Sequence, residues 1–291
     1  MPVQRKKKRK LNYKKIKALI AVVALIVVGY MAFKHGRQVI KADAEAESVQ
    51  PHLNDSLTNA MSSYAGTEKM DEIIEKYLKR WEVNGAQLAV SRNDSLVFAK
   101  GYGWAEKEKG QRMEPSNIMR IASVSKLVTA VGIMKLQEMG KVRLADHVFG
   151  PRGILNDTAY TNAIQDTKYL DITVEQLLRH QAGFTNYAGD PMFSTRYIMM
   201  QNHLSTPPTN PELLRIVLKK RHLSYQPGQG QKYCNIGYML LSLIIEKRSG
   251  MSYEAFMQKY VLRPAGCYDF HIAGNYYKDR HPREVKYYMH K

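Results

Sequence analysis

Acidic residues are absent from the first 41 positions of the chain, where 12 lysine and arginine residues fall. This stretch therefore carries +12 of the formal net charge of +18, and the other 250 residues carry only +6. A basic excess confined to one end argues against a protein that binds nucleic acid through its folded surface. We therefore expect no nucleic-acid partner, although the charge total alone would suggest one.

Cysteine is scarce as well, since Cys234 and Cys267 are the only two residues of this type. They allow one disulfide at most, and nothing in the sequence indicates that they pair. A chain of 291 residues can bury a sizeable core in one large domain or two small ones, so its stability does not require a disulfide. The sequence assigns neither cysteine a role, and it predicts no metal site and no cofactor.

A single long apolar run is present, at residues 18–33, directly after a basic segment at residues 5–17. A basic segment followed by an apolar run is typical of a membrane-targeting signal. The run is shorter than the roughly 20 residues that span a bilayer comfortably, but the flanking lysines can extend it by reaching to the interface. Small residues suited to cleavage appear only at residues 42–44, so an uncleaved anchor is favoured over a cleaved signal peptide.

These patterns predict a basic cytoplasmic tail at residues 1–17, a transmembrane signal-anchor at residues 18–34 and a linker or stalk at residues 35–66. The positive-inside rule keeps the N-terminus in the cytoplasm and sends the chain from about residue 40 onward across the membrane. The alternative of a basic nuclear or nucleic-acid-binding tail leaves the apolar run unexplained.

Periodic apolar patterns begin after residue 66. A helix is expected after Thr67, with one buried face formed by Met70, Ile73, Ile74, Tyr77, Leu78 and Trp81. Residues 87–91 and 95–102 predict a β-hairpin, because turn-forming residues join two strand-like runs. Further helices are expected at residues 123–139, 173–180, 211–219 and 236–248. One helix, a hairpin and a long helical stretch favour an α+β fold over alternating βαβ units.

Ser123 and Lys126 lie at the start of the expected helix at residues 123–139. Residues three apart share a helix face, so the Lys126 ammonium can lie beside the Ser123 hydroxyl. A serine becomes a good nucleophile when a neighbouring base accepts its proton, and a partly desolvated lysine can be that base. A capping serine with a solvated lysine is the alternative, because so short a motif arises by chance about once in a chain of this length.

Tyr233 and Asn235 form a second candidate pair, just before the expected helix at residues 236–248. Residues two apart in an extended segment point to the same side, which would give a proton-transferring hydroxyl and an amide that holds a substrate carbonyl or the lysine. Tyr160 and Asn162 have the same spacing, so spacing alone does not choose between the pairs. Tyr160 lies in a polar stretch with no strong element after it, and we therefore favour Tyr233 and Asn235.

These segments together resemble the serine β-lactamases and penicillin-binding proteins, specifically the branch of class C β-lactamases, D,D-peptidases and related esterases. The similar blocks are the nucleophile helix at residues 121–128, the segment at 172–184, the second motif with its following helix at 227–250, and the turn at 263–267. The four blocks come in the family's order over about residues 70–270. By this resemblance His180 is a structural residue of its block.

The resemblance implies a β-lactamase/transpeptidase-like fold for residues 67–291, with an antiparallel sheet flanked by helices and a mainly helical subdomain. It implies that Ser123 forms an acyl-enzyme, that Lys126 and Tyr233 share proton transfer, and that Asn235 orients the substrate. We therefore expect a serine hydrolase of the β-lactamase, D-alanyl-D-alanine carboxypeptidase or esterase type. Its substrates would be small molecules or peptidoglycan peptides, namely β-lactams, D-Ala-D-Ala peptides or small esters, and the sequence does not rank them.

The basic segment and the apolar run, taken with the resemblance to a bacterial family, predict a single-pass protein of the bacterial cytoplasmic membrane, with its catalytic domain on the periplasmic or extracellular side. The family's third motif, a basic residue or His, then Ser or Thr, then Gly, would follow on a strand roughly 100 or more residues after the second. Residues 248–250 match its letters but close a helix only 13 residues after Asn235. We therefore expect a domain that lacks its C-terminal third and has an incomplete sheet. A catalytically inactive binding or regulatory relative is the alternative, and a lipid-binding basic tail with a bystander domain is a third hypothesis.

Overall fold

The computed structural model describes residues 30–31, 56–62, 65–185 and 189–288. The chain divides into two units, Met1–Pro51 and His52–Lys291. Only Tyr30 and Met31 of the first unit are described, so the expected cytoplasmic tail and nearly all of the expected anchor lie outside the described residues. Among the described residues, no helix has both the length and the apolar character needed to cross a membrane. All elements named below belong to the second unit.

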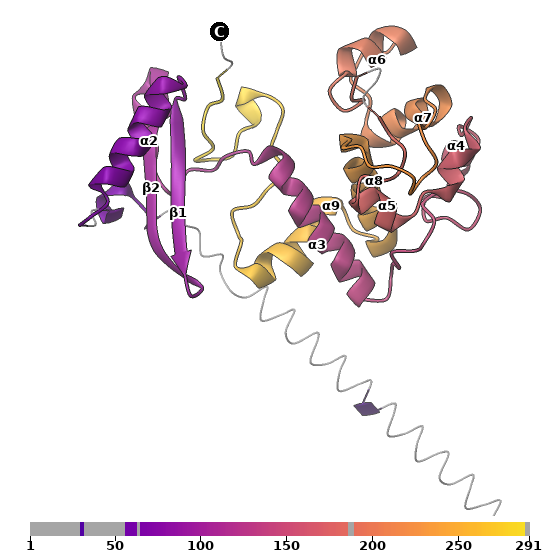
Figure 1. The fold of residues 1–291 in the computed structure, drawn as a ribbon, viewed down its shortest axis with the longest axis horizontal. Coiled ribbons are helices and arrows are strands. Elements are labelled where there is room, and N and C mark those ends of the chain that lie inside the picture. Colours follow the sequence, from indigo (N-terminus) through magenta and orange to yellow (C-terminus); the bar gives the residue numbers. More distant parts are fainter. Residues whose placement is uncertain (1–29, 32–55, 63–64, 186–188, 289–291) are drawn as a thin grey trace, which may run out of the picture. The chain divides into compact units, whose positions relative to one another are not determined.

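The hairpin expected from the sequence is confirmed, with β1 (Gly85–Arg92) antiparallel to β2 (Ser95–Glu106) (Figure 1). Asn93 and Asp94 join the strands, and both have a positive φ, 51° and 59°. That conformation gives the turn whose twist matches a hairpin, and Asn and Asp adopt it more readily than most residues. A third strand, β3 (Gln111–Arg112), pairs with β2. It is too short to show an alternating pattern, so the sequence did not predict it.

Helix α2 (Glu68–Arg80) lies against β2, where Asp71 accepts hydrogen bonds from Lys100 Nζ and Tyr102 Oη, each at 2.7 Å. The expected buried face is only partly correct. Leu78 is buried, whereas Ile73, Tyr77 and Trp81 are each more than half exposed. The described elements cover one side of α2 only, so apolar spacing overestimated how much of this helix is buried.

A short 3₁₀ helix, η2 (Asn59–Ser62), corrects the expectation that the linker continues to residue 66. Asn59 Nδ2 donates to Met113 O at 2.8 Å, and Gly101 N–H donates to Asn59 Oδ1 at 2.8 Å. The Ser62 hydroxyl donates to Ala99 O. These residues are therefore part of the folded unit. Side-chain hydrogen bonds to a strand leave no periodic apolar signal, which is why the sequence did not show this docking.

The helical layer holds the main hydrophobic core. Its α-helices are α3 (Ser125–Glu138), α4 (Thr158–Thr161), α5 (Val174–Leu178), α6 (Thr195–Asn202), α7 (Asn210–Lys220), α8 (Asn235–Ser249) and α9 (Tyr253–Met257). Short helices η3 (Lys107–Lys109), η4 (Ala122–Val124), η5 (Thr167–Asp171), η6 (Gln258–Leu262), η7 (Arg263–Ala265) and η8 (Tyr277–Asp279) complete the order. Helix α8 contacts both α3 and α5, and Ile236, Leu240 and Ile244 on it are fully buried. This arrangement confirms the α+β class.

The ends of these helices follow local signals. Thr209 and Glu212 form a capping box at the start of α7, and Gly250, with φ 74°, ends α8 in the left-handed conformation. Residues 248–250 are thus a helix end, as expected from the sequence. Helix α5 ends at Leu178, two residues earlier than expected, and His180 beyond it has a φ of 56°.

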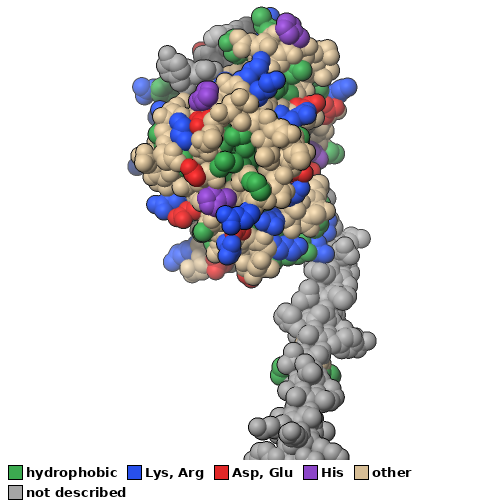
Figure 2. Space-filling view, turned by 90° about the vertical axis from the view of Figure 1, so that its right-hand side faces the viewer, with side chains coloured by type: hydrophobic (Ala, Val, Ile, Leu, Met, Phe, Trp, Pro, Cys, Tyr) green, Lys and Arg blue, Asp and Glu red, His purple; other side chains and the backbone are tan. Residues whose placement is uncertain are grey.

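The segment before Ser123 is held by the C-terminal part of the chain. Ile118 N–H donates to Arg283 O at 3.0 Å, and Val285 N–H donates to Ile118 O at 3.1 Å. Arg120 Nε lies 3.4 Å from Glu284 Oε1, whose side chain is almost fully buried. In Figure 1 this C-terminal segment lies between the hairpin and α3. On the face drawn in Figure 2, basic side chains stand among acidic, apolar and uncharged ones.

Candidate active site

Ser123 lies in η4, the 3₁₀ turn that leads directly into α3. The sequence placed Ser123 at the first position of the α-helix, and the structure starts that helix two residues later. Ala122 has a φ of 45°, a conformation that side-chain-bearing residues seldom adopt. Ser123 is exposed. The turn therefore presents the hydroxyl at the N-terminal end of α3, where the helix dipole favours negative charge.

The four candidate residues expected from the sequence lie in mutual contact. Ser123 Oγ is 2.6 Å from Tyr233 Oη. Lys126 Nζ donates to Ser123 Oγ at 3.3 Å and to Asn235 Oδ1 at 2.6 Å. Tyr233 Oη also lies 3.3 Å from Asn235 Oδ1. Two helix starts, η4 with α3 and the residues at the start of α8, thus bring four polar side chains from distant positions into one cluster.

The electrostatics of this cluster favour proton transfer to Tyr233. Hydrogen bonding to Lys126 lowers the pKa of Tyr233 below its ordinary value, and the hydrogen bond with Ser123 acts in the same direction. Partial burial and the charge of Asp190 oppose this shift. The Lys126 ammonium also lies 4.8 Å from the centre of the Tyr233 ring. A phenol with a lowered pKa beside a serine hydroxyl is suited to accept the serine proton.

Asp190 belongs to this site although the sequence gave no indication of it. Its Oδ2 atom accepts hydrogen bonds from Asn235 N–H at 3.1 Å and from Asn235 Nδ2 at 2.7 Å. Asp190 lies 45 residues before Asn235 in an irregular segment. No periodic pattern or short motif connects the two positions, so sequence reasoning had no signal to use.

His180 supports the segment that carries Tyr233. Its ring centre lies 4.7 Å from that of Tyr233 and 5.1 Å from that of Tyr238. Lys232 N–H donates to His180 O at 2.9 Å, and Cys234 N–H points to His180 Nδ1 at 3.5 Å. Burial and the Lys126 charge lower the pKa of His180, which favours the neutral ring that can accept at Nδ1. The contacts agree with a structural role.

The other residues considered from the sequence are not members of the Ser123 cluster. Tyr160 is buried in α4 within the helical core, and it is Tyr233 that meets Ser123. Cys234 and Cys267 are both free, the first buried and the second exposed. Burial raises the pKa of the Cys234 thiol to about 11, which disfavours the nucleophilic thiolate.

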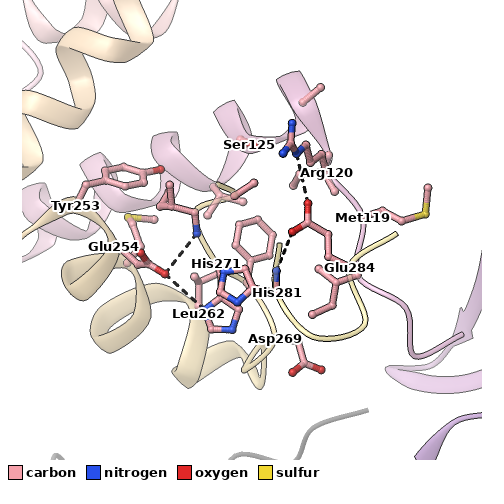
Figure 3. A pocket seen from close by; sticks show the side chains of 18 residues that line it. Met119, Arg120, Ser125, Tyr253, Glu254, Leu262, Asp269, His271, His281 and Glu284 are labelled. Carbon is pink, nitrogen blue, oxygen red and sulfur yellow. Dashed lines mark hydrogen bonds and ion pairs between the residues drawn. The ribbon is translucent and has the colours of Figure 1, made fainter. Parts of the chain in front are cut away.

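A pocket of about 310 Å³ lies beside the start of α3, and Figure 3 shows it from close by. Ser125 lines it on the α3 side, and the stacked rings of His271 and His281, 4.5 Å apart, belong to its opposite wall. Glu254 Oε1 lies 3.5 Å from His271 Nδ1. None of the four candidate residues lines this pocket, so it is separate from the Ser123 cluster.

Comparison with known proteins decides the family. The profile described as Beta-lactamase matches residues 70–290. The chain belongs to this Beta-lactamase family. Penicillin-binding protein 4* of Bacillus subtilis is 26% identical over 220 residues, which are 75% of this chain and 44% of that protein. Protein flp of Staphylococcus aureus (strain MW2) is 26% identical over 214 residues, 74% of this chain and 40% of that protein. The chain thus spans less than half the length of these curated relatives.

Similar solved structures show which fold this Beta-lactamase family member has. An octameric penicillin-binding protein homologue from Pyrococcus abyssi matches with a TM-score of 0.53 and 28% identity, over 69% of this chain and 43% of that one. EstCE1, a hydrolase with promiscuous acyltransferase activity, matches with a TM-score of 0.54 and 21% identity, over 68% of this chain and 51% of that one. A class C β-lactamase matches with a TM-score of 0.53 and 21% identity, over 69% of this chain and 49% of that one. The resemblance to serine β-lactamases and penicillin-binding proteins is confirmed, as is the β-lactamase/transpeptidase-like fold.

Proposed function

We propose that this Beta-lactamase family chain is a serine hydrolase that forms an acyl-enzyme on Ser123. The observation that carries the proposal is the 2.6 Å contact between Ser123 Oγ and Tyr233 Oη, with Lys126 Nζ donating to Ser123 Oγ. A nucleophile in hydrogen-bond contact with a proton acceptor, which a third group orients and tunes, is the arrangement that acyl transfer requires.

In the proposed reaction the Ser123 proton moves to the Tyr233 oxygen while Ser123 Oγ bonds to the substrate carbonyl carbon. The oxyanion that forms lies at the N-terminal end of α3, whose dipole stabilises it. Tyr233 returns the proton to the leaving nitrogen or oxygen as that bond breaks. Water then repeats the same steps on the ester, releasing the acid and restoring Ser123. Lys126 remains the cation that stabilises the Tyr233 phenolate, and Asn235 holds Lys126 in place.

The proposed substrates are D-Ala-D-Ala peptides, β-lactams and small esters. Each has an acyl carbon bonded to a leaving nitrogen or oxygen, which is the bond that the Ser123 cluster is suited to break. Relatives named as penicillin-binding proteins, at 26% and 28% identity, support the β-lactam and peptide classes.

We also propose that the chain is anchored in a bacterial cytoplasmic membrane, with the catalytic domain on the outer side. The support is the sequence pattern of a basic segment at residues 5–17 followed by the apolar run at residues 18–33. External protease added to spheroplasts should then degrade the domain. A domain that survives in intact spheroplasts but is cut after lysis would place it in the cytoplasm.

Covalent labelling tests the hydrolase proposal. The purified chain should react with a fluorescent penicillin or a fluorophosphonate, and Ser123→Ala should remove the label. Ser125→Ala is the matched control, because Ser125 lies two residues away but lines the separate pocket. Equal labelling of Ser123→Ala would identify another nucleophile. A folded wild-type chain that reacts with neither probe would favour the inactive binding relative.

A further inference from the structure

The Asp190 carboxylate accepts three hydrogen bonds that join two parts of the helical layer. Its Oδ2 atom accepts from the backbone N–H and the side-chain Nδ2 of Asn235, at 3.1 and 2.7 Å. Its Oδ1 atom accepts from Met192 N–H at 2.9 Å, and its backbone oxygen accepts from Phe193 N–H at 3.0 Å. The carboxylate is therefore fixed by the turn that precedes α6 and is directed at the start of α8.

We infer that Asp190 is a positioning residue, whose carboxylate fixes the Asn235 amide with its oxygen toward Lys126 and thereby holds Lys126 against Ser123 and Tyr233. The inference rests on the proposed function, because it assigns a role to Asp190 in the same acylation step. Asp190 acts through Asn235 and Lys126, and it takes no proton from the substrate or from Ser123.

The orientation of the Asn235 amide follows from the groups on its two sides. A carboxylate only accepts hydrogen bonds and an ammonium only donates them. The amide NH₂ therefore faces Asp190, and the amide oxygen faces Lys126 at 2.6 Å. A reversed amide would place NH₂ hydrogens against the ammonium and its oxygen against the carboxylate. Asp190 and Lys126 thus each oppose the reversed orientation, and removing Asp190 leaves Lys126 as the only one of the two that opposes it.

Two other roles for Asp190 do not fit its contacts. A general base for Ser123 would need a carboxylate oxygen near Ser123 Oγ, a position that Tyr233 Oη occupies at 2.6 Å. A binding group for a cationic substrate would need an oxygen directed at solvent. Among the described residues, Met192 and Asn235 together engage both carboxylate oxygens.

Asp190 also contributes to the charge around Tyr233. The groups that face Tyr233 include Ser123 in η4, Lys126 on α3, His180 after α5, Asn235 and Tyr238 on α8, and Asp190. The Asp190 charge raises the pKa of Tyr233, against the larger lowering by Lys126. Removing this charge alone should therefore lower the pKa of Tyr233, and releasing Lys126 as well should raise it again.

Two variants separate the charge of Asp190 from its positioning effect. In Asp190→Asn the side-chain oxygen can still accept from Asn235 Nδ2, so the rate of Ser123 acylation should stay within about three-fold of the wild-type rate. In Asp190→Ala the acceptor is lost and acylation should slow roughly 10- to 100-fold, the usual effect of leaving a partly buried donor unpaired. Asp157→Asn is the control, because it removes an equal charge from an exposed ion pair with Lys247.

The second measurement does not depend on acylation. NMR of protein labelled with ¹³C at the tyrosine ring carbon that bears the hydroxyl, with Tyr233→Phe used to assign the signal, follows the ionisation of Tyr233. We expect its pKa to be lower in Asp190→Asn than in the wild type, and higher in Asp190→Ala than in Asp190→Asn. Both variants lack the charge, so the difference between them reports the position of Lys126.

Equal Tyr233 pKa values in the two variants would overturn the inference, as would a wild-type acylation rate in Asp190→Ala. The inference would also be overturned if Asp190→Ala acylated more slowly only because its melting temperature is lower, with no difference in the Tyr233 pKa between the two variants. Asp190 would then have a structural role alone. A wild-type chain that shows no Ser123-dependent labelling would refute the proposed function, and the Tyr233 titration would still decide the role of Asp190.

Discussion

Tyr233 Oη lies 2.6 Å from Ser123 Oγ, although the two residues are 110 positions apart in the chain. Ser123 comes from the turn before α3, and Tyr233 from the extended residues before α8. These two helices pack against each other, so the contact depends on the core beneath it. The chemistry and the stability of the helical layer are therefore linked, and separate variants can test each of them.

Tyr233→Phe should slow acylation of Ser123 by about 10²–10⁴-fold, the usual contribution of a positioned proton acceptor. The substitution removes one oxygen and keeps the ring that packs against His180. The melting temperature should therefore change little. Tyr197→Phe, at an exposed tyrosine on α6, is the matched control and should react at the wild-type rate. Rapid labelling of Tyr233→Phe would show that another group takes the Ser123 proton.

Lys126→Gln should shift the pH dependence of acylation. The hydrogen bond from Lys126 is the largest cause of the lowered pKa of Tyr233, so its loss raises that pKa. If the Tyr233 phenolate is the active form, the rising part of the rate profile moves to higher pH and the rate at neutral pH falls. Labelling rates across a pH series measure this shift. Lys135→Gln is the control, because Lys135 is on the same helix but pairs with Glu138, and it should leave the pH dependence of the labelling rate unchanged. An unchanged pH dependence in Lys126→Gln would contradict the role assigned to Lys126.

Much of this site was predictable from local sequence signals. Helical spacing joined Ser123 to Lys126, and alternation in an extended segment joined Tyr233 to Asn235. The hairpin and the end of α8 at Gly250 were predictable because turn residues and left-handed glycines have strong local preferences.

The features that the sequence did not predict depend on tertiary contacts. Asp190 reaches Asn235 through an irregular segment, and Asn59 docks on the sheet through side-chain hydrogen bonds. Neither arrangement leaves a period in the sequence. Exposure of Ile73 and Trp81 was missed for a related reason, because periodicity identifies an apolar face without showing whether another element covers it.

His180 should make the folded unit sensitive to mild acid. Its pKa in the folded state is lowered from 6.5 by burial and by the Lys126 charge. The unfolded chain then binds a proton more readily than the folded one, so the stabilising effect is fully present above pH 6.5 and is lost as the pH falls through the lower folded value. His180→Phe keeps an aromatic ring but does not titrate. Urea unfolding of both proteins should show the wild type losing stability relative to the variant below pH 6.5, and parallel curves would contradict this.

Leu240→Ala should destabilise the core on which both halves of the site rest. Leu240 on α8 is fully buried, and such truncations cost about 2–5 kcal/mol of unfolding free energy. Leu127→Ala on α3 is the control, because that side chain is 68% exposed and should change stability by no more than about 0.5 kcal/mol. Chemical denaturation of the two variants measures the difference, and equal losses would show that Leu127 is covered in solution.

Ala122→Gly should be unusually well tolerated for a substitution beside the proposed nucleophile. Ala122 has a φ of 45°, and the left-handed conformation costs a residue with a Cβ atom about 1–2 kcal/mol, a strain that glycine removes. Glycine also adds conformational freedom to the unfolded chain, which costs roughly 0.5–1 kcal/mol. The two effects oppose each other, so the unfolding free energy should stay within about 1 kcal/mol of the wild-type value or rise.

Ala130→Gly within α3 is the matched control for this strain. Ala130 lies inside a regular helix and has no left-handed conformation that glycine could relieve. The same change there should therefore lower the unfolding free energy by about 1 kcal/mol, the usual cost of glycine in a helix interior. Denaturation curves of the two variants compare the positions directly. A larger loss in Ala122→Gly than in Ala130→Gly would mean that Ala122 is not strained in solution, and that the turn presenting Ser123 has a different backbone from the one described.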